Sequence, residues 1–231
     1  LIMKSPLVIF LFLIGTVVLT AQSATIVDSD GWTNVRVKPS KDSEVTTRVN
    51  QGEFFFWIDP EYNHDFGDWI EVLIPKNRFT TSGRSIDSNT FVRGFIHKSR
   101  VVPVEKVESY TGDHFTFKYT LEPFSTSGKR IDFDERGEVI RINGRAFFGS
   151  DMESPYVQTA KAEVTIGEKT IPIHDIFLED IYECDNDFEI YKLDNLFIVH
   201  QWNSDGAGAY ELTWVFNEQG ELLQRLVGTI I

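Results

Sequence analysis

Short alternating runs that end in turn residues constrain this chain more than any other feature of its sequence. Phe115, Phe117 and Tyr119 alternate with polar residues, as the residues of a half-buried strand do. Similar runs flank turns with glycine, asparagine or aspartate at 134–137, 167–168, 194–195 and 219–220, and such turns join antiparallel strands. Only residues 175–183 favour a short helix. The sequence therefore predicts an all-β protein whose C-terminal part is an antiparallel β-sheet or β-sandwich.

The N-terminal part has the same character with shorter elements. Val35 and Val37 alternate with Arg36 and Lys38 before a proline, and residues 53–58 form a dense aromatic run. Five or six short strands with tight turns and no helical period predict a small barrel.

Three segments of this part occur in an order that points to a known family. They are residues 31–40 (GWTNVRVKPS), 67–72 (GDWIEV) and 94–101 (GFIHKSRV). Together they resemble the bacterial SH3 domain family, in which an N-V-R-x-x-P-S opening, a G-x-W-x-x-V central strand and a G-Y/F-V/I-H closing strand recur. The resemblance covers residues 24–106 and implies an SH3-like barrel. It does not extend to residues 110–231.

Two departures from the family pattern concern loops. Lys38 stands where the family usually has a glycine, so this turn must use a conformation open to a residue with a Cβ atom. Residues 75–90 form a polar insertion that is longer than most hairpin connections. The insertion is either a binding loop or a disordered loop tip.

The resemblance also implies a ligand, because modules of this family usually bind peptidoglycan or its stem peptides. Aromatic side chains stack well on sugar and peptide faces. The candidate ligand contacts are Trp32, Tyr62, Trp57 and Trp69. Trp32 and Tyr62, which polar turn residues flank, are the stronger surface candidates, and most of the other rings are expected in the core.

The first residues of the chain have the pattern of a secretory signal peptide. Lys4 precedes an apolar run at 6–20, and the small residues Ala21 and Ser23 follow. The run is shorter than the roughly 20 apolar residues that a spanning helix needs. We expect residues 1–23 to be removed, with cleavage after Ser23 or alternatively after Ala21. The protein is then exported, periplasmic or secreted, and has no membrane segment once the signal is cleaved.

Cysteine usage and length bound the rest of the molecule. Cys184 is the only cysteine, so no intramolecular disulfide can form. About 208 residues remain after cleavage, which is enough for two small domains that each bury a core. The predicted domains are the SH3-like module at 24–106 and an acidic β domain at 110–231.

Charge is unevenly divided between these parts. Residues 24–108 hold 13 acidic and 11 basic side chains, whereas residues 109–231 hold 22 acidic and 10 basic ones. The C-terminal part therefore repels nucleic acid and favours a basic partner, although acidity also simply keeps an exported protein soluble. Its candidate partner contacts are Trp202, Asp205 and Tyr210, around a loop of small residues.

Few residues of the sequence are candidates for catalysis or for metal binding. Cys184 with His174 or His200 would make a thiol dyad, but neighbouring carboxylates should raise the pKa of this thiol. Asp185 and Asp187 favour a solvated turn over a calcium loop, which needs more oxygen ligands and a glycine. We predict no metal and no cofactor.

The sequence thus predicts a non-enzymatic binding protein of the cell envelope, with an SH3-like module for peptidoglycan or a wall peptide and an acidic domain for a second partner. One alternative is an inhibitor or immunity-type protein for a basic enzyme such as a lysozyme or toxin. Another is a cell-wall hydrolase.

Overall fold

The fold is all-β, as predicted. A computed structural model of the chain describes residues 21–58, 64–80, 89–150, 153–204 and 208–229. In these ranges the regular elements are β-strands and three short 3-10 helices. No helix in these ranges is long and apolar enough to cross a membrane.

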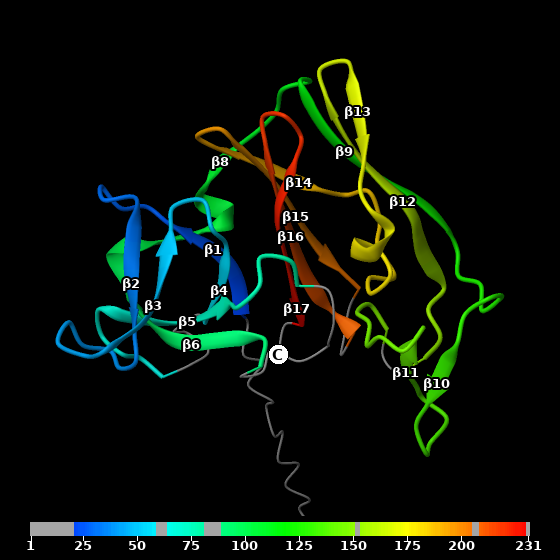
Figure 1. Cartoon of the computed structure of the whole chain (residues 1–231), viewed down its shortest axis with the longest axis horizontal. Coiled ribbons are helices and arrows are strands. Elements are labelled where there is room, and N and C mark those ends of the chain that lie inside the picture. The colour runs from blue at the N-terminus through cyan, green and yellow to red at the C-terminus, as the bar shows by residue number, and fades with distance from the viewer. Residues whose placement is uncertain (1–20, 59–63, 81–88, 151–152, 205–207, 230–231) are drawn as a thin grey trace, which may run out of the picture.

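The N-terminal half forms one seven-stranded sheet in the order β3-β2-β6-β5-β4-β1-β7 (Figure 1). Its strands are β1 (Ala21–Ile26), β2 (Trp32–Arg36), β3 (Val45–Asn50), β4 (Phe55–Ile58), β5 (Trp69–Pro75), β6 (Phe91–His97) and β7 (Val101–Pro103). Six of them, β1 to β6, contribute to one buried cluster that contains Ile26, Val35, Phe55 and Val72. Within the described residues the edge strands β3 and β7 are not paired with each other, so closure into the SH3-like barrel stays a prediction.

A glycine allows the closing segment of the family-like pattern to pack on the opening one. Gly94 lies in β6 against β2, and a Cβ atom built there would be 2.5 Å from Val35 Cγ1 and 2.9 Å from the Arg36 carbonyl oxygen. A larger residue would push β2 away from β6. The turn at Lys38 fits its residue as well, since no positive φ is found there.

The C-terminal half contains three more antiparallel groups of strands. Five strands form a sheet in the order β17-β16-β15-β14-β8, three form a sheet in the order β13-β12-β9, and β10 pairs with β11. The strands are β8 (Glu108–Ser109), β9 (Phe115–Pro123), β10 (Ile131–Phe133), β11 (Val139–Ile142), β12 (Val157–Ile166), β13 (Lys169–Pro172), β14 (Glu189–Leu193), β15 (Leu196–Asn203), β16 (Tyr210–Asn217) and β17 (Leu222–Thr229). The predicted hairpins are all present. The predicted helix at 175–183 is wrong, because only the 3-10 turn Asp175–Phe177 forms there.

The five-stranded sheet is the central layer of the molecule (Figure 1). On one face its side chains, including Leu212 and Trp214, pack against β9 and β12 as in a sandwich. On the other face Ile198 and Val215 pack against residues of the N-terminal half, among them Phe54. Among the described residues, the N-terminal half therefore has one apolar cluster of its own, the C-terminal half has two, and a fourth joins the halves.

The polar insertion docks the two halves together. Phe79 forms a parallel bridge with Arg225 of β17. The Arg225 N–H donates to the Arg78 carbonyl oxygen at 2.9 Å, and the Thr80 N–H donates to the Arg225 carbonyl oxygen at 3.0 Å. These bonds extend the central sheet by a short segment. Residues 81–88 lie outside the described residues, so the choice between binding loop and loop tip is not tested for them.

A buried ion pair lies directly behind this contact. Arg225 Nη2 donates to Asp180 Oδ1 at 2.7 Å, and both side chains are fully buried. Arg225 also donates to the Thr80 carbonyl oxygen. Burial raises the pKa of Asp180, although the charges of Arg225 and Arg145 oppose the rise. The pair holds the insertion, β17 and the 175–183 segment at one point.

Loss of the Asp180 charge should therefore destabilise the whole protein. Asp180→Asn leaves the Arg225 guanidinium buried without its counterion, and we expect the free energy of unfolding to fall by about 3–5 kcal/mol. Urea denaturation followed by tryptophan fluorescence measures this. Glu218→Gln, which removes an exposed pair with Lys192, is the control and should change stability by less than about 1 kcal/mol. Equal effects of the two variants would contradict the assignment.

Candidate functional site

A groove on the N-terminal half gathers two of the predicted ligand contacts. Trp32 comes from β2 and Trp69 from β5, and both line a hollow of about 380 Å³ with His97 from the end of β6. This hollow is called the tryptophan groove below. It is open to solvent, and its two indole rings are partly exposed.

Strand register explains why these residues meet. Trp69 pairs with His97 across β5 and β6, and their rings make an edge-to-face contact with centroids 5.7 Å apart. At Trp32, the Arg48 guanidinium lies 4.1 Å from the centroid of the ring. Arg48 Nε also donates to Asn34 Oδ1 at 3.3 Å. Both rings are thus held in place by neighbours, which limits the entropy lost on binding.

His97 presents a hydrogen-bond donor at the groove. Its Nδ1 accepts from the Ser99 backbone N–H at 3.3 Å and lies 2.8 Å from Ser99 Oγ. Because Nδ1 is an acceptor, the neutral ring carries its proton on Nε2. His97 is exposed, so this N–H is available to a ligand.

Charged residues of both signs complete the lining. Asp28 is nearly buried, forms an ion pair with Arg100, and accepts from the Asp30 N–H at 3.0 Å. Arg36 Nη1 donates to the Ser43 carbonyl oxygen at 2.6 Å. Lys41 also lines the groove. Indole faces beside cations suit a ligand with sugar or peptide faces and carboxylates.

The other predicted ligand contacts do not join this groove. Trp57 is buried in the core of the N-terminal sheet, so its prediction as a surface contact is wrong. Its place in β4, where four consecutive residues are buried, is the physical reason. Tyr62 lies outside the described residues. Sequence reasoning gave His97 no ligand role, although its position in the closing motif, opposite Trp69, was the available signal.

The predicted partner contacts of the C-terminal half are not brought together. Trp202 is 43% exposed and packs edge-to-face on His200. Tyr210 is fully buried and donates to the Tyr182 carbonyl oxygen at 2.9 Å, so the prediction that it contacts a partner is wrong. Asp205 lies outside the described residues.

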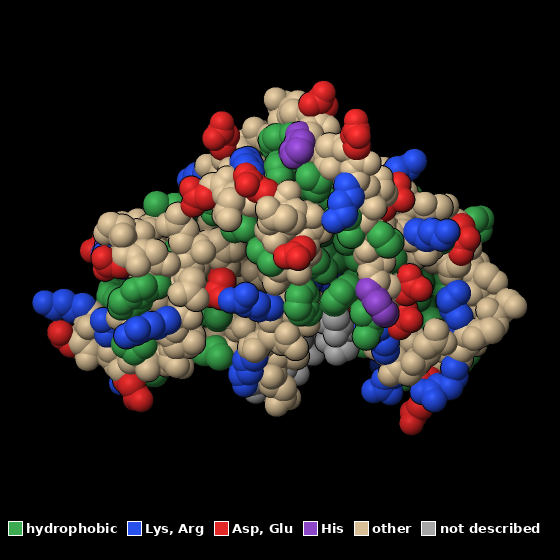
Figure 2. Space-filling view, turned by 45° about the horizontal axis from the view of Figure 1, so that its top comes forward, with side chains coloured by type: hydrophobic (Ala, Val, Ile, Leu, Met, Phe, Trp, Pro, Cys, Tyr) green, Lys and Arg blue, Asp and Glu red, His purple; other side chains and the backbone are tan. Residues whose placement is uncertain are grey.

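Acidic side chains do not gather on the face that Figure 2 shows. There the acidic residues are scattered among lysine and arginine over both halves. That face therefore offers no concentrated negative patch for a basic partner.

A buried polar chain connects the two halves near β1. Glu211 accepts from the Ser23 N–H at 2.8 and 3.1 Å and from His200 Nε2 at 2.8 Å. His200 Nδ1 lies 3.2 Å from Glu189 Oε2. Burial lowers the pKa of His200, but hydrogen bonds and charges from Glu211 and Glu189 outweigh burial and raise it. The imidazolium form thus suits a bridge between two carboxylates, and the chain serves as a structural link.

The acidic turn at 185–187 is internally satisfied. Asp185 Oδ1 accepts from the Asp187 N–H at 2.8 Å and from Gln201 Nε2 at 2.7 Å. Within the described residues, no group of three or more His, Cys, Asp or Glu side chains is placed to hold a metal ion. The turn is better explained by its own hydrogen bonds than by a cation.

Cys184 is not placed for nucleophilic chemistry. The side chain is buried, with Sγ 3.0 Å from the Tyr210 hydroxyl. Burial raises the pKa of the thiol to about 11. His200 hydrogen-bonds Glu211 and Glu189 instead, and His174 caps the turn at Ile176. A thiol dyad therefore does not form.

The thiol should be unreactive in the folded protein. At pH 8 a group with a pKa of about 11 is almost entirely protonated, and its burial blocks access. We expect no reaction with Ellman's reagent in buffer and one thiol per chain in 8 M urea. Ser127→Cys, at an exposed turn, is the positive control and should react in buffer. Fast labelling of native Cys184 would contradict the structure.

Comparison with protein-family models and with curated proteins finds no match to this chain. The likeness of its three N-terminal segments to bacterial SH3 domains therefore rests on the residues themselves.

Proposed function

We propose that the protein is exported and binds peptidoglycan or a wall peptide through the tryptophan groove, without cleaving it. The observation that carries the proposal is the convergence of Trp32 and Trp69, from separate family-like segments, on one hollow that also contains His97. A polymer of sugars and short peptides offers flat faces to the indoles and carboxylates to Arg36 and Lys41.

The C-terminal half packs on the N-terminal half that carries this groove. The apolar cluster that joins the halves includes Phe54 and Val104 on the N-terminal side. Separation of the halves would expose these side chains to water, at a cost of about 25 cal/mol per Å² of apolar surface. Experiments on ligand binding are therefore best made with the whole chain and point variants.

Sedimentation with insoluble peptidoglycan tests the proposal. The whole chain should pellet with the wall and release no soluble fragments. Trp32→Ala and Trp69→Ala should each weaken binding by about tenfold, because each removes one stacking face. Trp202→Ala, which removes a partly exposed indole far from the groove in sequence, is the matched control and should bind normally.

Two results would contradict this function. Equal pelleting of all the tryptophan variants would show that the wall is bound elsewhere. Release of muropeptides by the pure protein would show catalysis and favour the hydrolase alternative.

Contacts of Ser23 bear on the site of signal cleavage. Ser23 N–H donates to Glu211, and Ser23 Oγ lies 2.8 Å from Thr213 Oγ1, with all three residues buried. A cut after Ser23 would remove these bonds and leave Glu211 buried with fewer donors, which costs about 1–3 kcal/mol. A cut after Ala21 keeps them.

On export we therefore expect Gln22 to be the first residue of the mature protein. Mass spectrometry of the intact exported chain measures this to one residue. Within the proposed function, a mature N-terminus at Ala24 would show that β1 starts later than the structure has it.

A further inference from the structure

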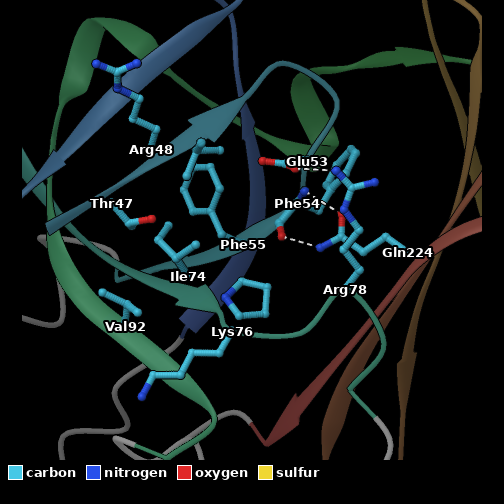
Figure 3. Close-up of a pocket in the computed structure, with 12 residues that line it drawn as sticks. Thr47, Arg48, Glu53, Phe54, Phe55, Ile74, Lys76, Arg78, Val92 and Gln224 are labelled. Carbon is cyan, nitrogen blue, oxygen red and sulfur yellow. Dashed lines mark hydrogen bonds and ion pairs between the residues drawn. The ribbon is translucent and has the colours of Figure 1, made fainter.

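A second groove lies on another side of the N-terminal half, where the sheet is open. It has a volume of about 380 Å³ and lies between β3 and the ends of β4 and β5. Figure 3 shows Thr47, Phe55 and Ile74 around its middle, with Arg48 and Lys76 extending outward. It is called the β3 groove below. It reaches the C-terminal half at Gln224 of β17.

Strand pairing leaves this groove open. Among the described residues β3 is the end strand of its sheet and pairs with β2 alone. β4 pairs with β5 through Phe56 with Leu73 and Trp57 with Val72, so this pairing ends one residue before Ile74. Ile74 pairs with Val92 of β6 on its other side. Among the described residues, no strand therefore fills the space between the free edge of β3 and the edge of β5 at Ile74.

The register of β3 directs the backbone N–H and C=O of Arg48 toward the groove. The Gln51 N–H donates to the Gly31 carbonyl oxygen at 2.9 Å, and hydrogen-bonded pairs alternate along an antiparallel ladder. Arg48, three residues earlier, is therefore at a position whose N–H and C=O point away from β2. Asn50, at the equivalent position, already bonds outward to Glu53 through its N–H at 2.9 Å and its C=O at 3.1 Å.

Charge around the groove is mostly positive. Among the described residues, Arg48, Lys76 and Arg78 line it with one carboxylate, Glu53. Glu53 pairs with Arg78 at 2.9 Å. The described lining thus has a net charge of two positive units, in contrast to the acidity of the chain as a whole. Such a rim favours a ligand that carries carboxylates.

The floor is apolar and fixed. Phe54 and Phe55 are almost fully buried, and the Gln224 side chain bonds the Phe54 backbone through both its groups, at 2.8 and 2.6 Å. The Gln224 amide thus satisfies the Phe54 N–H and C=O, as a paired strand would, and it holds Phe54 against the C-terminal half. A preformed floor of this kind needs little rearrangement on binding.

We propose that the β3 groove is a second binding site, which takes an extended acidic peptide segment as an added strand along β3. Backbone bonds at Arg48 hold the segment in register, alternate apolar side chains lie on Ile74 and Val92, and its carboxylates face Lys76. This site adjoins the tryptophan groove at Arg48, whose guanidinium stacks on Trp32, but the proposed peptide binding does not depend on the function of that groove.

A labelled peptide tests the site directly. The probe is an acetylated, amidated peptide of alternating glutamate and valine, and its binding to the whole chain is followed by fluorescence anisotropy. We expect saturable binding that weakens with salt. A lysine–valine peptide should not bind, and an acidic peptide with proline at every second position should not bind because it cannot donate to a strand edge.

Two further measurements distinguish binding of the peptide as an added strand from nonspecific electrostatic attraction. Lys76→Glu should weaken binding by about tenfold and leave sedimentation with peptidoglycan unchanged, whereas Arg136→Glu, in an exposed turn far along the chain, should bind like the wild type. Hydrogen exchange at the Arg48 amide should slow when the peptide is bound.

Three outcomes would overturn the proposal. They are equal binding by Lys76→Glu and the wild type, unchanged exchange at Arg48 in the saturated complex, and self-association of the chain that Lys76→Glu abolishes. The last would show that a second copy of this chain fills the groove.

Discussion

Burial of the five-stranded sheet on both faces determines how the rest of the structure is built. Seven consecutive residues of β16 are buried, so neither face of this strand meets water. Every polar group on it must then find a partner inside the protein. Glu211 and Thr213 do so across the boundary between the halves, with Ser23 of β1. The N-terminal sheet is thus held to the C-terminal one by polar contacts as well as apolar ones.

These partners give the junction its specificity. An apolar contact tolerates small shifts, but the bonds that join Glu211 and Thr213 to Ser23, and Arg225 to Thr80, require one relative placement of the halves. Gln224 adds two backbone bonds to Phe54. The floor of the β3 groove therefore has its shape only when both halves are assembled, whereas the tryptophan groove is lined by the N-terminal half alone.

Local patterns in the sequence predicted the strands and two of the residues that line the tryptophan groove. Glycine, asparagine and aspartate turns act within a few residues, so the hairpins were found correctly, and Trp32 and Trp69 were both among the predicted ligand contacts. Trp57 and Tyr210 were misplaced because an aromatic residue in an alternating run looks the same whether its face meets water or another sheet. The docking of Phe79 on Arg225 joins residues far apart in sequence, and no local pattern reports such a contact.

The short segment at Arg78–Thr80 also protects the protein from its own neighbours. β17 is the last strand of the central sheet and is largely apolar. An uncovered edge of this kind is a template on which strands of other molecules can assemble into aggregates. Because Arg78 and Thr80 occupy the backbone groups of Arg225, the template is interrupted in the middle of the strand. A shorter loop without this segment would leave the edge of β17 open, and the folded chain would then be more prone to aggregate.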